Sequence, residues 1–144
     1  MQLSNIPSLN RSVHKTQTWL KELNELGHLD NEQQAYSVLR AVLHALRDRL
    51  TIDEAANFAA QLPMIVRGLY YEGWRPSATP KKYKDRSEFY DRIRQELRER
   101  SDLDVVHATN AVFGLLSAKI TAGEMDNLRE MMPADLRLLW PAQA

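Results

Sequence analysis

The chain matches itself when it is shifted by 70 residues, and the match needs no gap. Thr51 then meets Thr121, and Pro63 meets Pro133, while the apolar positions stay in phase. Other aligned pairs are Trp19 with Phe89, Leu46 with Leu116, Leu50 with Ile120, Glu54 with Glu124, Leu62 with Met132, and Tyr70 with Trp140. Solenoid repeats have periods of about 20–50 residues. The longer period predicts a duplicated multi-helix unit rather than an array.

Apolar residues recur every three or four positions through both copies, and no segment alternates as a half-buried strand does. Four helices are expected in the first copy: about Val13 or Thr16 to Leu26, Asn31 to Arg49 with Asp30 as cap, Thr51 to Leu62, and a short helix from Pro63 to Gly73. Four are expected in the second copy: one capped by Ser87 and ending at about Arg100, one capped by Asp102 and ending at about Lys119, Thr121 to Met132, and Pro133 to Trp140. The predicted fold is therefore all-α.

The clearest helix start is Thr51-Ile52-Asp53-Glu54. A threonine followed three residues later by glutamate forms a capping box, in which each side chain bonds to the other residue's backbone N–H. Thr121 and Glu124 repeat this spacing. Pro63 suits the first turn of a helix but not its interior, so a break is expected at Leu62.

The domain organisation follows from these boundaries. We expect an N-terminal arm over residues 1–15 and a single helical domain over residues 16–144. Within that domain, about eight helices form two pseudo-repeated four-helix halves, about 16–71 and 87–140, packed into one globular unit. Residues 74–86 form a basic linker between the halves, in which Pro76 and Pro80 oppose helix formation.

Composition excludes several classes of protein. The 144 residues are 44% hydrophobic, enough to bury a core, and contain no cysteine for disulfides or thiolate chemistry. The N-terminus does not resemble a secretory signal, and no apolar run approaches the ~18 residues of a membrane span. We therefore expect a cytoplasmic protein without membrane contact. Lys plus Arg and Asp plus Glu are both 19, which argues against a dedicated nucleic-acid binder.

Two candidate interaction surfaces are visible in the sequence. An aromatic and arginine cluster comprises Arg67, Tyr70, Tyr71, Trp74 and Arg75. Such residues dominate interaction hot spots, but they also pack structurally when their polar ends find partners. The basic linker adds Lys81, Lys82, Tyr83 and Lys84, which could contact phosphates and stack a base. The candidate surface is Arg67, Tyr71, Trp74, Arg75, Lys81, Lys82, Tyr83 and Lys84.

Catalytic and metal-binding patterns are absent from the sequence. His44 and Asp48 share a helix face at i and i+4, but two groups do not make a zinc site, and no further ligand has a telling spacing. No glycine-rich phosphate loop or Gly-x-Ser-x-Gly elbow occurs. We expect no enzyme activity, no cofactor and no bound metal.

The run AVLHALRDRLTIDEAANFAAQLPMIVRGLYYEGWRP, Ala41 to Pro76, resembles a bacterial family known only as domain of unknown function 2267. The shared features are the LRAVL…LRDRLT helix, the EA…AAQLP break and the RG-YY-GW ending, with a weaker match from Gly123-Glu124 to Trp140. The chain departs from the pattern at Met131-Met132-Pro133, where Gln-Leu-Pro is expected. The resemblance implies a small helical protein and supplies no functional residues.

The sequence thus favours a non-enzymatic protein–protein interaction or adaptor module whose partner is another protein. Two alternatives stay open: nucleic-acid contact through the linker from Arg75 to Arg86, and a small ligand held between the halves.

Overall fold

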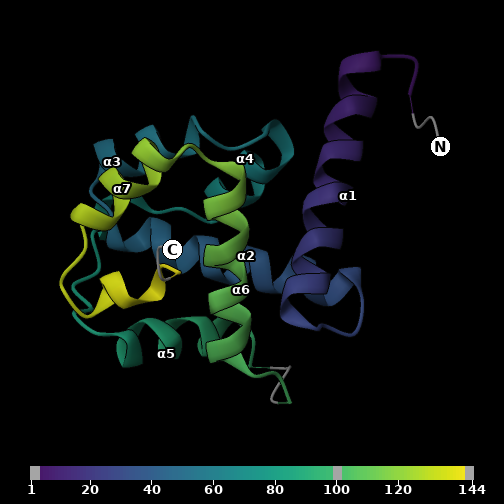
Figure 1. Ribbon diagram of the computed structural model, residues 1–144. Coiled ribbons are helices and arrows are strands. Elements are labelled where there is room, and N and C mark those ends of the chain that lie inside the picture. Colours follow the sequence, from purple (N-terminus) through teal and green to yellow (C-terminus); the bar gives the residue numbers. More distant parts are fainter. Residues whose placement is uncertain (1–3, 99–101, 142–144) are drawn as a thin grey trace.

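A computed structural model gives the fold and describes residues 4–98 and 102–141 (Figure 1). These residues hold seven α-helices and two short 3-10 helices, without a strand. In chain order they are α1 (Pro7–Gly27), α2 (Glu32–Arg49), α3 (Ile52–Ala59), α4 (Met64–Tyr71), η1 (Pro76–Ala78), α5 (Arg86–Glu96), α6 (Val105–Lys119), α7 (Ala122–Glu130) and η2 (Leu136–Leu139). The predicted all-α class is confirmed.

The expected eighth α-helix is not present among the described residues. After Pro133 the chain forms only the four-residue 3-10 helix η2, which ends at Leu139. Pro141 follows closely and has no backbone N–H to continue a helix. The segment is therefore too short to form more than a single tight turn.

Helix α2 lies at the centre of the molecule. Eight consecutive residues, 41–48, are buried, so this helix is enclosed on every side in its second half. Helices α1, α4, α5 and α6 all pack against it, and α1 also packs along α6. The apolar residues of all these helices join in one core cluster.

The N-terminal arm expected over residues 1–15 is wrong for residues 7–15, which form the first two turns of α1. Pro7 occupies the first helical turn, where its missing N–H costs nothing. Ser4 and Asn10 close the start, because the Asn10 amide donates to the Ser4 carbonyl oxygen at 2.9 Å. This part of α1 projects beyond the body of the molecule (Figure 1).

Several helix boundaries follow the sequence closely. Thr51 caps α3, and both hydrogen bonds of its capping box with Glu54 are formed. Thr121 caps α7 by accepting from the backbone N–H of Glu124 at 3.4 Å. Pro63 directly precedes α4, and Gly73, with a φ of 74°, follows its end.

Three predicted caps are wrong by one or two residues. Asp30, Ser87 and Asp102 were the expected caps of α2, α5 and α6, and Asn31, Asp85 and Asp104 occupy those positions. Each observed cap accepts from the backbone N–H three residues later, which satisfies one free helix donor. Helix α5 ends at Glu96, whereas the expected end, about Arg100, lies outside the described residues.

No helix in the described ranges is both long and apolar enough to cross a membrane.

Candidate functional site: a basic groove beside α1

A groove of about 950 Å³ separates the first half of α1 from the rest of the molecule. One wall is α1, the facing wall is the connection between α3 and α4, and Lys119 at the end of α6 closes it. Its lining residues are Pro7, Asn10, Arg11, His14, Lys15, Thr18, Trp19, Gln61, Pro63 and Lys119. We call this feature the α1 groove.

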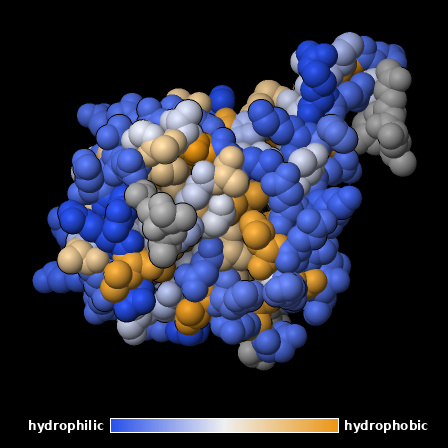
Figure 2. Space-filling view, viewed as in Figure 1, coloured by the Kyte–Doolittle hydropathy of each residue, from blue (hydrophilic) through white to orange (hydrophobic). Residues whose placement is uncertain are grey.

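The α1 groove exists because only part of α1 has packing partners. Trp19, Leu20 and Leu23 are buried against the body, but Ile6 and Leu9 at the other end are 53% and 41% exposed. The groove-lining residues of α1 recur at intervals of three and four, so they share one face of the helix. The projecting end is visible at the upper right of Figure 2.

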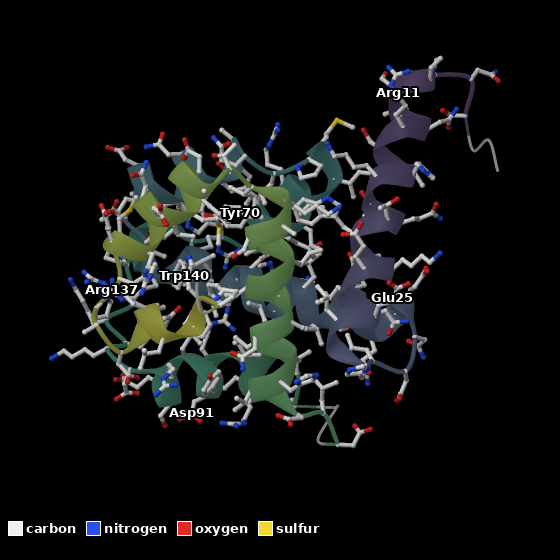
Figure 3. The ribbon with its side chains drawn as sticks, in the orientation of Figure 1. Arg11, Glu25, Tyr70, Asp91, Arg137 and Trp140 are labelled. Atoms are coloured by element: carbon white, nitrogen blue, oxygen red, sulfur yellow. The ribbon has the colours of Figure 1, made fainter. Side chains whose placement is uncertain are left out.

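The charge of the lining is one-sided. Arg11, Lys15 and Lys119 are cations, His14 lies among them, and no carboxylate of the described residues lines the groove. Lys119 is partly neutralised by Glu22, whose carboxylate lies 2.8 Å from Nζ. Within the described ranges, no carboxylate comes within ion-pair distance of Arg11 or Lys15. Arg11 stands on the projecting end of α1 (Figure 3).

None of the eight candidate residues predicted from the sequence lines this groove. Arg67 has a structural role, because its guanidinium donates to the carbonyl oxygens of Ala59 at 3.1 Å and Leu62 at 2.9 Å. It therefore closes the C-terminal end of α3. Arg137 makes a similar pair of bonds, to Met132 at 3.0 Å and Glu130 at 3.3 Å, of which only the Met132 acceptor matches an Arg67 acceptor, Leu62, under the 70-residue shift.

The aromatic cluster is partly core and partly surface. Tyr70 is fully buried, and its hydroxyl donates to the carbonyl oxygen of Ala55 at 2.9 Å. Tyr71 and Trp74 are half-buried with ring centroids 5.3 Å apart, and Arg75 is exposed. Tyr70 is labelled inside the body in Figure 3. The structure thus pairs the rings of Tyr71 and Trp74, with the exposed Arg75 next in the chain, whereas the guanidinium of Arg67 is engaged at the end of α3.

The basic linker is held against α2. The backbone N–H of Lys81 donates to the Asp48 carbonyl oxygen at 2.6 Å, and the Tyr83 hydroxyl donates to that of Ala45. Lys81, Lys82 and Lys84 are exposed, but Tyr83 is only 8% exposed. The expectation that Tyr83 offers a stacking surface is therefore wrong, since its ring packs edge-on against Phe89.

The buried ionisable groups form a separate network on α2. Glu96 accepts from Arg40 at 2.9 Å, from Arg92 at 3.3 Å, and lies 3.0 Å from His44. Burial alone raises the pKa of Glu96, but the hydrogen bond and charge of His44 and the charges of Arg92 and Arg40 outweigh it and lower that pKa. This network links α2 to α5.

The described ranges place no three histidine, aspartate or glutamate side chains where they could hold a metal ion.

The sequence did carry one signal for the α1 groove. Arg11, His14 and Lys15 are spaced as one helix face, and the first acidic residue of the chain is Glu22. This signal is visible only if the helix is extended back to Pro7.

Comparison with known proteins gives a family and no function. The model of a family described as an uncharacterized conserved protein, DUF2267, matches residues 16–139. The match covers most of the chain, so the chain belongs to this family. No curated protein matches it.

Proposed function

We propose that this family member is a non-enzymatic, cytoplasmic interaction module that binds a segment of another protein in the α1 groove. The observation that carries the proposal is the incomplete packing of α1. Its first two turns leave the body and form one wall of a groove of about 950 Å³. A segment that entered the groove would contact three separate parts of the chain at once.

The open shape of the groove favours a polypeptide segment. Small-molecule pockets enclose most of their ligand's surface, whereas this groove is open on one side. Grooves beside helices commonly accept a second helix, which contacts the walls with side chains one turn apart. The exposed side chains of Ile6 and Leu9 lie at the same end of α1 and would be available to such a partner.

Site-specific photocrosslinking tests the proposal. A benzoylphenylalanine in place of Asn10 places the photoreactive side chain in the lining of the groove. The same residue in place of Gln17 is the matched control, since Gln17 is exposed on α1 but does not line the groove. We expect a protein from the native host to crosslink at Asn10 only. The crosslinked partner, once purified, should then bind this chain in purified form. Identical products at both positions would contradict the proposal.

The aromatic surface gives a competing location for the same function. Trp74→Ala combined with Arg75→Ala removes the accessible part of the aromatic cluster without touching the groove. If a protein that the wild-type chain retains in a pull-down from the native host is lost with this variant, and no crosslink forms at Asn10, the interaction belongs to the aromatic surface.

Nucleic-acid contact through the linker is the alternative proposal. Its support is the row of exposed side chains at Lys81, Lys82 and Lys84, on a segment fixed to α2. Replacing all three with Gln should abolish binding that weakens steeply with salt. Failure of the wild-type chain to shift an oligonucleotide at low salt would remove it.

We further propose that the chain arose as a duplication of a four-helix unit. The groove between α3 and α7 supports this, because its walls contain pairs related by the 70-residue shift: Glu54 with Glu124, Asn57 with Asn127, Phe58 with Leu128, and Gln61 with Met131. The similar carbonyl bonds of Arg67 and Arg137 give independent support. This smaller groove, about 340 Å³, is also where a small ligand between the halves would bind.

A further inference from the structure

We infer that the segment bound by the α1 groove is acidic, with carboxylates repeated at one-turn spacing along a helix. This inference rests on the proposed function and names the chemistry of the partner. It follows from the side chains that the groove presents and from those that it lacks.

The groove holds cations without internal partners. Arg11 and Lys15 are exposed, and within the described ranges neither forms an ion pair. Elsewhere the arginines Arg40, Arg47, Arg86, Arg92 and Arg94 each pair with a carboxylate. Arg11 and Lys15 are therefore available to a ligand at no cost in internal ion pairs, whereas Lys119 pairs with Glu22.

The distribution of charge along the chain also favours an acidic ligand at α1. No acidic residue precedes Glu22 in the sequence, whereas the same stretch contains Arg11, His14, Lys15 and Lys21. The whole chain is nevertheless neutral, with 19 residues of each sign. Besides the basic linker, the α1 wall is thus a second positive region of the chain, and it would orient an acidic ligand toward this groove.

The geometry of α1 sets the spacing of the expected carboxylates. Arg11 and Lys15 are four residues apart on one helix face, which corresponds to a rise of about 6 Å along the axis. Carboxylates at positions i and i+4 of a partner helix have the same separation. His14 lies between the two cations in the chain and lines the same groove.

A protein ligand fits the groove better than a nucleic acid. Trp19 lines the groove but is only 2% exposed, so its ring gives no platform for a stacked base. The apolar part of the lining, with Pro7 and Pro63, suits aliphatic side chains that alternate with the acidic positions of an amphipathic helix.

The test uses the full chain and a fluorescein-labelled, alanine-based helical peptide with glutamate at every fourth position. The same peptide with lysine in place of glutamate and a labelled oligothymidine are the comparison probes. We expect fluorescence anisotropy at low salt to show binding of the glutamate peptide only. Arg11→Glu with Lys15→Glu should weaken it on the order of tenfold or more, because two attractions become repulsions.

The matched control is Lys82→Glu with Lys84→Glu, which changes the net charge equally at exposed positions outside the groove. This control should bind the peptide as the wild type does. Arg11→Gln with Lys15→Gln should give an intermediate loss and serves if the double reversal unfolds the chain. Equal weakening by the two reversal variants, equal binding of the lysine peptide, or binding of oligothymidine alone would overturn the inference.

The crosslinking experiment separates this inference from the proposed function. A partner captured at Asn10 through a segment without acidic residues, and unaffected by the reversal at Arg11 and Lys15, would overturn the acidic assignment but leave the groove as the binding site. Capture of nothing specific at Asn10 would overturn the proposed function itself.

Discussion

The carboxylate of Glu96 lies 3.0 Å from Nδ1 of His44, whose Nε2 lies 2.9 Å from the carbonyl oxygen of Leu69. The carboxylate and the carbonyl oxygen can each accept a hydrogen bond from the ring. The imidazole thereby joins α2 to α4 and to the last turn of α5. Asp48, on the same face of α2 as His44, bonds instead to Arg47 at 2.8 Å and Arg92 at 3.2 Å.

Glu96→Gln should destabilise the protein in a pH-dependent manner. The pKa of Glu96 is lowered in the folded chain. The stabilisation from its carboxylate is therefore complete above the unfolded-state pKa, about 4.3, and is lost as the pH falls through the lower folded-state pKa. Urea unfolding should show a cost of about 1–3 kcal/mol at neutral pH. The difference from wild type should shrink below about pH 4.

The exposed Asp91 provides a control on the same helix, since it pairs with Arg94 at the surface at 3.3 Å. Asp91→Asn should change the free energy of unfolding by less than about 1 kcal/mol. An effect of Glu96→Gln that is equally small, or that persists unchanged in acid, would show that the carboxylate does not stabilise the junction.

Removing the two threonine caps should have unequal effects. Thr51→Ala loses a complete capping box, in which the Thr51 N–H donates to Glu54 at 2.9 Å and the hydroxyl accepts at 3.3 Å. Thr121→Ala loses one bond of 3.4 Å. Each cap contributes about 1 kcal/mol, with the larger value expected at Thr51. Thermal unfolding of the two variants measures the difference, and a larger loss at Thr121 would contradict this account.

Arg67→Lys should destabilise the protein although the charge is kept. The guanidinium reaches two carbonyl oxygens, those of Ala59 and Leu62, in a geometry that a single ammonium cannot reproduce. The expected cost is about 1–3 kcal/mol by urea unfolding. Arg75→Lys, at a neighbouring exposed position, is the comparison and should be nearly silent. Equal stability of the two variants would assign Arg67 no role at the end of α3.

Leu46→Ala should lower the free energy of unfolding by about 2–5 kcal/mol, because the side chain is fully buried in the enclosed second half of α2. Leu116→Ala, the position related by the 70-residue shift, is also fully buried and should cost a similar amount. Chemical denaturation of both variants measures this. If one variant loses about 2–5 kcal/mol and the other falls outside that range, the proposed duplication would be weakened.

The elements predicted best are those with local signals that have no competitor. Thr51 with Glu54, the break at Pro63 and the end at Gly73 each depend on a single residue type with a special backbone role. The misplaced caps have competitors close by. Asp30 and Asn31 can both cap a helix, and packing of α2 decides between them.

The α1 groove could not be predicted from sequence patterns. Its walls come from residues 7–19, from Gln61 and Pro63, and from Lys119, and only the tertiary packing of α1 beside α4 and α6 brings them together. The burial of Tyr83 was hidden for a similar reason. A tyrosine among three lysines looks solvent-exposed, but its hydroxyl reaches the Ala45 carbonyl oxygen on α2.

The enclosure of α2 has a consequence for the timescale on which different backbone amides meet water. An amide near Leu43 exchanges its hydrogen only after α1, α4, α5 and α6 have separated from α2, so its rate reports the opening of the whole molecule. An amide near Ser12, on the projecting turns of α1, exchanges through local fraying. The ratio of the two exchange rates therefore compares global with local stability within one sample. A ligand in the groove would slow exchange near Ser12 before it altered exchange near Leu43.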